Sequence, residues 1–307
     1  MQIVVDSVYR KPRSQFREIM HLGGPINWLR MKAGINQMQQ ASLNLTVTAP
    51  GDLTPDSPAI HFLTGKKFWF QTIFCMVSLQ KVSPVAIRFH VHDDGSFDDS
   101  LEKVIHLQVP GVVIHRKSDT DERLRKVLPE SKYPYLNHKR KVYPHIRKLL
   151  DVHAGSTGYK VVADSDMLFF RTPVLLFDWL KNPDRPFYIP DKLNSYGFTS
   201  ERIFSVLGQR IPEKVNVGLI GLDSGSIDWD QMERWATELE RGTLGSYFLE
   251  QTLTAMYLAG KSCVIGPEAD YIVMPTHKQV KQTEGVLHHY VDTSKPDYFI
   301  YAWKKIR

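Results

Sequence analysis

From residue 59 onward, short apolar runs alternate with longer segments that have one apolar face. The apolar runs predict strands at 59–63, 85–92, 159–163, 217–222 and 286–291, with weaker ones at 104–107 and 111–114. The longer segments predict helices at 68–79, 138–150, 229–240 and 247–259. Strands that alternate with helices of this length indicate an α/β fold, in which helices flank a mostly parallel sheet on both faces.

The first 57 residues follow a different pattern. They carry helical signals, strongest over 28–40, and end in a segment rich in proline, glycine and aspartate at 49–58 that predicts a loop. We therefore expect a helical N-terminal lead-in at 1–57 and one domain, large enough for an enzyme, at 58–307.

Composition narrows the location of the protein. The 307-residue chain has no apolar run of 18 residues, which argues against a membrane span, and its first residues lack the pattern of a signal peptide. Cys75 and Cys263 are far apart and lack metal-ligand spacing, as expected in a reducing compartment. A cytoplasmic protein is the expectation.

The net charge of +6 has two interpretations, a scattered surface excess or attraction to phosphorylated and membrane-surface partners. The densest basic segment, 138–148, is interleaved with apolar residues and predicts one amphipathic helix with a basic face. We expect no nucleic-acid partner and leave peripheral membrane contact open.

Three Asp-x-Asp triplets occur, and context separates them. Asp119/Asp121 lies in a charged stretch that predicts a solvated loop, and Asp228/Asp230 is placed to N-cap a helix. Asp164-Ser165-Asp166 instead follows the apolar run 159–163, so a buried strand would deliver two carboxylates to its C-terminal end. Open α/β sheets bind ligands at that end, and paired carboxylates there attract a divalent cation that can hold a diphosphate.

Other signals bear on the same chemistry. No Gly-x-Gly-x-x-Gly or Walker motif follows a predicted strand, which leaves a metal as the device for holding a diphosphate. Asp93-Asp94-Gly95 also ends a strand, although a simple turn is favoured there. His289 is followed six residues on by Lys295, so an imidazole could ligate the metal while a lysine meets a phosphate oxygen. Such a mixed ligand set suits Mn²⁺, with Mg²⁺ as a substitute.

Over residues 59–303 the chain resembles the GT-A-fold glycosyltransferases, nearest to retaining family 8, the group of glycogenin and the bacterial lipopolysaccharide galactosyltransferases. Asp164-Ser165-Asp166 stands in the place of the family DxD, and His289 with Lys295-Pro296 matches its late histidine and lysine. Asn216-Val217-Gly218 is similar to the family Asn-x-Gly strand, and Glu250-Gln251 resembles its Asp-Gln pair, with glutamate in place of aspartate.

The resemblance implies a role for each matching residue. Asp164, Asp166 and His289 would bind the metal, and Lys295 the donor diphosphate. Asn216 would lie beside the donor sugar, and Glu250 or Gln251 would stabilise charge near the anomeric carbon. The nucleobase and ribose would be held by Leu63, Thr64, Gly65 and Asp93, with Asp164 and Ser165 also contacting the donor. Apart from these matches, Arg147 on the basic helix is chosen by its distance from Asp164 along the chain: it would reach the diphosphate or the donor hydroxyls, and an exposed surface position is the equal alternative.

The implied function is a metal-dependent hexosyltransferase that moves a sugar from a nucleotide diphosphate-sugar, such as a UDP-sugar, to an acceptor hydroxyl with retention. The acceptor would be a carbohydrate, a lipid-linked molecule or a small molecule. Two alternatives stay open: a metal-dependent phosphohydrolase using the same aspartates, and a non-catalytic nucleotide- or carbohydrate-binding protein on the same scaffold.

Overall fold

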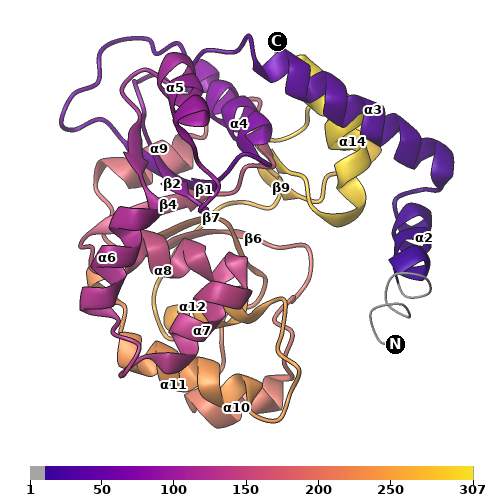
Figure 1. Ribbon diagram of the computed structural model, residues 1–307. Coiled ribbons are helices and arrows are strands. Elements are labelled where there is room, and N and C mark those ends of the chain that lie inside the picture. The colour runs from indigo at the N-terminus through magenta and orange to yellow at the C-terminus, as the bar shows by residue number, and fades with distance from the viewer. Residues whose placement is uncertain (1–10, 307) are drawn as a thin grey trace.

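The computed structural model describes residues 11–306 and centres on a seven-stranded sheet (Figure 1). Its strand order is β3-β2-β1-β4-β7-β6-β8. The strands are β1 (Ala59–Thr64), β2 (Arg88–Asp93), β3 (Val113–His115), β4 (Tyr159–Ala163), β6 (Phe187–Pro190), β7 (Val215–Asp223) and β8 (Val264–Ile265). A second sheet has the order β5-β10-β9, formed by β5 (Met167–Phe169), β9 (Tyr271–Val273) and β10 (Leu287–His289).

The half of the large sheet from β3 to β4 is parallel, and β7 runs antiparallel to both β4 and β6. The carboxyl ends of β1, β2 and β4 therefore meet at one edge. The backbone N–H of Asp94 donates to the carbonyl of Thr64 at 2.9 Å, which ties two of these ends together. The mixed, mostly parallel α/β architecture expected from the sequence is confirmed.

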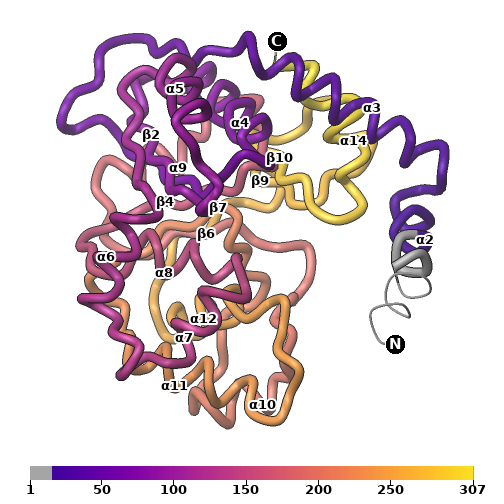
Figure 2. Tube along the Cα trace, viewed as in Figure 1, coloured from indigo at the N-terminus to yellow at the C-terminus, as the bar shows by residue number. Residues whose placement is uncertain are grey.

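Helices cover both faces of the large sheet (Figures 1 and 2). One face packs on α4 (Trp69–Val82), α5 (Asp99–Gln108) and α9 (Val174–Lys181), which contribute to one apolar cluster. The other face packs on α8 (Arg147–His153) and α12 (Leu249–Leu258). These two helices share a second apolar cluster with α6 (Lys117–Val127), α7 (Pro134–Val142), α10 (Ser200–Leu207) and α11 (Trp229–Glu240). The sheet thus separates two apolar cores, as burial on both faces of a parallel sheet requires.

The N-terminal segment is helical where it is described. Helix α2 (Lys11–His21) precedes α3 (Pro25–Ser42), which lies along α14 (Lys295–Ile300) near the other end of the chain (Figure 1). Gly34 permits this packing, because a Cβ there would lie 2.0 Å from the carbonyl oxygen of Phe299. The helix expected over 28–40 is confirmed inside α3. Residues 1–10 of the expected lead-in lie outside the described part of the chain.

The strand expected at 104–107 is wrong, because these residues belong to α5. The Asp98 carboxylate accepts a hydrogen bond from the backbone N–H of Leu101 and caps this helix. Apolar residues at 104, 105 and 107 imitate a strand locally, but the cap and the acid in the first turn favour a helix.

The single basic helix expected over 138–150 is also wrong. Helix α7 ends at Val142. Pro144 opens a 3-10 turn (Pro144–Ile146), and α8 begins after it at Arg147. Proline lacks the N–H that a continuous helix would need at that position. The break gives α8 its own direction, and α8 packs on β1 and β4.

The two other Asp-x-Asp triplets are structural. Asp119 and Asp121 lie on α6 instead of the expected solvated loop, and Asp121 forms ion pairs with Lys117 and Arg140. Asp228 caps α11 through the backbone N–H of Gln231, as expected.

The remaining described elements are α13 (His277–Gln282) and the 3-10 turns Ser224–Ser226, Asp292–Ser294 and Ala302–Lys305. Among the described residues, no helix combines the length and apolarity needed to cross a membrane.

Candidate active site at the carboxyl edge of the sheet

Asp164, Asp166 and His289 converge at the end of β4. Asp164 follows β4, Asp166 precedes β5, and His289 ends β10, which pairs antiparallel with β5. One ligand atom from each residue lies within 4.8 Å of the others. The backbone holds the triplet at both ends, because Asp164 N–H donates to Gly218 O at 2.7 Å and Tyr290 N–H donates to Asp166 O at 2.9 Å.

His289 is buried, and its ring makes no well-aligned hydrogen bond to the two aspartates beside it. Its Nε2 lies 3.3 Å from Asp166 Oδ1 and 3.7 Å from Asp164 Oδ2. Neither of its ring nitrogens has a hydrogen-bond partner among the described residues. A buried polar atom without a partner costs about 1–3 kcal/mol, so it calls for an explanation. Coordination of a cation together with the two carboxylates would satisfy it.

Electrostatics at Asp166 favour an anion. Burial alone would raise the pKa of this carboxyl, but the nearby His289 and the charge of Lys295 outweigh burial and hold its pKa below the ordinary value. Two carboxylates and a neutral imidazole form a donor set that suits Mn²⁺ and, less well, Mg²⁺. The residues present therefore fit a divalent metal.

A buried lysine lies on the other side of Asp164. Lys148 Nζ, on α8, is 2.9 Å from Asp164 Oδ1 and 3.8 Å from Glu250 Oε2. Burial alone would lower the pKa of Lys148, but the two carboxylates raise it well above its ordinary value. Burial also raises the pKa of Glu250 to about 7, against the opposing effect of Lys148. Lys148 thus links the candidate metal ligands to the candidate catalytic pair.

Glu250 and Gln251 open α12, as the sequence predicts, and both are buried. The Gln251 side-chain amide donates to Asp191 Oδ2 at 3.2 Å, which orients it. Asn216 lies on β7, and its side-chain oxygen accepts the N–H of Gly218 at 2.9 Å. These residues line the same strand ends as the Asp-Ser-Asp triplet.

Ser165 takes part in a hydroxyl chain between elements. Its Oγ is 2.8 Å from the Thr72 hydroxyl of α4, which is 2.7 Å from the Thr64 hydroxyl of β1. Next to Thr64, Gly65 touches the Asp94 carboxylate so closely that a Cβ would lie 2.1 Å from it. The loops after β1 and β4 are thereby fixed to each other.

Asp93 has mainly a turn-forming role. One oxygen accepts the N–H groups of Gly95 and Phe97 at 2.7 and 3.1 Å, and the other accepts the N–H of Lys117 at 3.3 Å. The turn that the sequence favours at 93–95 is present. Leu63 lies next to it in register, opposite His92.

Lys148, and not the expected Arg147, contacts the Asp-Ser-Asp triplet. Arg147 donates to the backbone carbonyls of Asp94 and Arg140, at 2.6 and 3.1 Å. Lys148, the next residue, is the one that contacts Asp164. Distance along the chain could not resolve this choice, because the break at Pro144 sets which side chain of α8 faces the site.

Lys295 opens α14 and is exposed, and its charge acts on Asp166. It has no ion pair within 4.0 Å among the described residues, which leaves its ammonium available at the mouth of the site. Sequence reasoning missed Lys148 and Thr72. A lysine in the segment 138–150 looked like one of several surface cations, and Thr72 lay in an apolar helix.

No family model and no curated protein matches the sequence. The structure nevertheless has the fold of GT-A-like glycosyltransferases. It is similar to the galactosyltransferase LgtC solved with donor and acceptor sugar analogues, with 15% identity and a TM-score of 0.52 over 81% of this chain and 93% of LgtC. It is also similar to the apo bifunctional glycosyltransferase WbbM, with 11% identity and a TM-score of 0.51 over 85% of this chain. The chain spans about half of WbbM, 53% of its length.

Proposed function

We propose that this chain is a metal-dependent glycosyltransferase that moves a hexose from a nucleotide diphosphate-sugar, most simply a UDP-sugar, to an acceptor hydroxyl. The observation that carries the proposal is the convergence of Asp164, Asp166 and the buried His289 at the carboxyl edge of a GT-A-like sheet. Ligands of open α/β sheets bind at this edge.

Asp164, Asp166 and His289 would hold the metal, Mn²⁺ or in its place Mg²⁺. A bound divalent cation supplies positive charge that stabilises a departing diphosphate. Lys295 would add a second positive charge at the exposed mouth of the site, where its ammonium can meet a phosphate oxygen. Electrostatic stabilisation of developing charge is commonly the largest contribution to such a reaction.

Lys148 positions Asp164. Its ammonium is buried between Asp164 and Glu250, so it fixes both carboxylates without facing solvent. Glu250 and Gln251 would face the donor sugar and support positive charge at the anomeric carbon, with Asn216 beside the sugar. We propose that these side chains give electrostatic support and form no covalent intermediate.

The proposed stereochemical outcome is retention. The acceptor hydroxyl would attack from the side of the leaving diphosphate, and a phosphate oxygen of the donor would take its proton. Leu63, Thr64, Gly65 and Asp93 would lie along the nucleoside, with Ser165 and Arg147 fixing the loops behind it. A cytoplasmic location and a carbohydrate, lipid-linked or small-molecule acceptor complete the proposal.

The two alternative functions are less well supported. A phosphohydrolase acting on simple esters usually uses more acidic or histidine ligands than these three. A non-catalytic binding protein would be expected to have lost ligands, yet all three and Lys295 are present.

The experiment is UDP release from a panel of nucleotide sugars, with and without Mn²⁺. The proposal predicts Mn²⁺-dependent release from at least one UDP-sugar and none from simple phosphate esters. The anomeric configuration of the product, measured by NMR, then tests retention. Ester hydrolysis without transfer would support the phosphohydrolase instead.

A further inference from the structure

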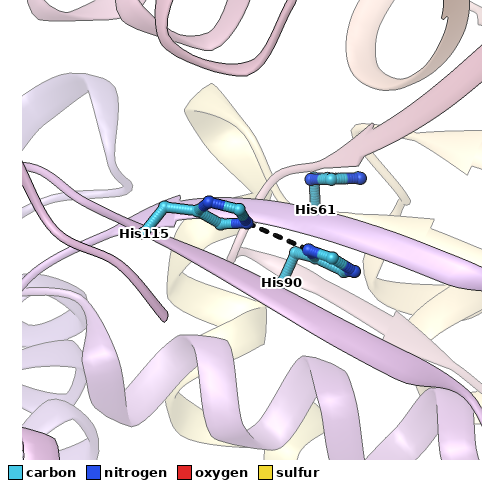
Figure 3. A group of neighbouring side chains, drawn as sticks. All are labelled: His61, His90 and His115. Atoms are coloured by element: carbon cyan, nitrogen blue, oxygen red, sulfur yellow. Dashed lines mark hydrogen bonds between the residues drawn. The ribbon is translucent and has the colours of Figure 1, made fainter. Parts of the chain in front are cut away.

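Four histidines form a separate array on one face of the sheet. His61 on β1 lies opposite His90 on β2, and His92 on β2 lies opposite His115 on β3. Because residues two apart on a strand face the same side, His90 and His92 bring the two pairs together. Figure 3 shows His61, His90 and His115 side by side across the three strands.

The imidazoles contact one another directly. His90 Nδ1 lies 3.0 Å from His115 Nε2, and His61 Nδ1 lies 3.0 Å from His92 Nε2. The rings of His61 and His90 stack at 4.4 Å between centroids, and those of His92 and His115 at 4.3 Å. Each close nitrogen pair requires one N–H and one lone pair, so at least one nitrogen of each pair is an acceptor.

The array is neutral and incompletely satisfied. Burial lowers the pKa of all four histidines, and the charge of Lys160 acts in the same direction. The neighbouring imidazoles lower the pKa of His61, His90 and His92 further. His92 is 2% exposed, and its Nδ1 has no hydrogen-bond partner among the described residues. Neutral imidazoles with free lone pairs are the form that binds metals.

We propose that His61, His90 and His115 form a second metal site for a borderline transition-metal cation, of which Zn²⁺ is the simplest, with His92 or water completing the coordination. One nitrogen from each of the three lies within 4.8 Å of the others. The stacked rings would turn about their Cβ–Cγ bonds to aim these nitrogens at one point, and that torsion is soft in histidine.

Ligand type separates this site from the one at Asp164. An all-imidazole set suits Zn²⁺, Cu²⁺ or Ni²⁺, whereas carboxylates favour Mg²⁺ and Mn²⁺. No carboxylate is among the ligands, and Lys160 and Arg123 act on the array as positive charges, so the affinity should be moderate. His90 and His115 are only half-buried, which gives the cation an entry path.

The test is titration of metal-stripped protein with Zn²⁺ alone, followed by calorimetry, in an Asp166→Asn background that weakens the other site. His90→Gln and His115→Gln alter the two accessible ligands, and His106→Gln is the matched control, because its side chain is 56% exposed on α5. Circular dichroism of the metal-free variants establishes that each is folded, and His115→Gln on the edge strand is the milder change.

The proposal predicts that both variants lose one equivalent of Zn²⁺ binding and that the His106→Gln control keeps it. Co²⁺ in the same background should give visible d–d absorption typical of a tetrahedral, nitrogen-rich site, and His115→Gln should abolish that absorption. Unchanged stoichiometry, with affinity within about twofold in both folded variants, would overturn the second site. The experiment measures Zn²⁺ binding at a site whose ligands differ from those of the candidate catalytic site. Failure of the second-site proposal therefore leaves the glycosyltransferase proposal intact.

Discussion

The α-carbon of Gly218 lies directly against the imidazole of His289. A Cβ at position 218 would be 2.3 Å from His289 Cε1, 2.7 Å from its Nδ1 and 2.7 Å from the Met167 methyl group. Gly218 also accepts the backbone N–H of Asp164 through its carbonyl. One glycine of β7 therefore places two of the three candidate metal ligands, which gives a physical reason for the Asn-x-Gly pattern.

Gly218→Ala should displace His289 and weaken metal-dependent UDP binding at least tenfold. Forcing a methyl group into this contact should also lower the free energy of unfolding by about 1–3 kcal/mol. Calorimetric titration with UDP and Mn²⁺, together with urea unfolding, measures both effects. Gly225→Ala is the control, because the nearest atom to its added Cβ is 3.6 Å away and its φ is not positive. Equal UDP affinities in the two variants would contradict the role of Gly218.

Lys148→Met should destabilise the metal-free protein by about 3–5 kcal/mol, because it leaves the Asp164 and Glu250 carboxylates without their shared cation. Adding Glu250→Gln should recover part of this loss, because burial already raises the pKa of Glu250 to about 7 beside Lys148, and without Lys148 this side chain must take up a proton on folding. A double-mutant cycle by urea unfolding should give an interaction energy of about 0.5–3 kcal/mol. Additivity within about 0.3–0.5 kcal/mol would show that the 3.8 Å contact between Lys148 and Glu250 contributes nothing.

The stability of the protein should fall on acidification through His153. Burial lowers the pKa of this histidine from 6.5 to about 3, and its Nδ1 lies 2.9 Å from Ser224 Oγ. Between these pH values the unfolded chain binds the proton and the folded chain does not, so the free energy of unfolding falls as pH decreases below 6.5. By pH 5 the loss from this group is about 2 kcal/mol.

His153→Asn should remove that part of the pH dependence. Urea unfolding of both proteins at pH 7.5 and about pH 5 measures the difference. His106→Gln, at an exposed position on α5, should leave the pH dependence as it is. Parallel curves for the parent protein and His153→Asn would mean that His153 is protonated in the folded state.

The sequence predicted the fold where local and tertiary preferences agree. The run 159–163 coincides with β4, and 229–240 coincides with α11, since continuous apolar character or a capping aspartate marks them. The strand predicted at 104–107 was wrong because a few apolar residues at this spacing fit both the two-residue period of a strand and the 3.6-residue period of a helix. Strands such as β8 and β9 have two or three residues, too few to show any period before the neighbouring strand is known.

For the site, the sequence predicted residue types better than partners. Asp164, Asp166 and His289 do come together, because β10 pairs with β5 immediately after the Asp-Ser-Asp triplet. Choosing Lys148 over Arg147 would have required the direction of α8, which depends on the interruption at Pro144. The histidine array was equally hidden, because only the register of β1, β2 and β3 aligns its members.

Asp166→Asn tests the central claim most directly. The UDP affinity of the parent protein, this variant and Asp119→Asn is measured by calorimetry with and without Mn²⁺, and circular dichroism establishes that each is folded. Asp119 belongs to a look-alike Asp-x-Asp triplet on α6, outside the site. We predict that Mn²⁺ strengthens UDP binding in the parent and in Asp119→Asn, and that Asp166→Asn loses this gain. Undiminished Mn²⁺-dependent UDP binding in folded Asp166→Asn would contradict the metal-dependent donor site.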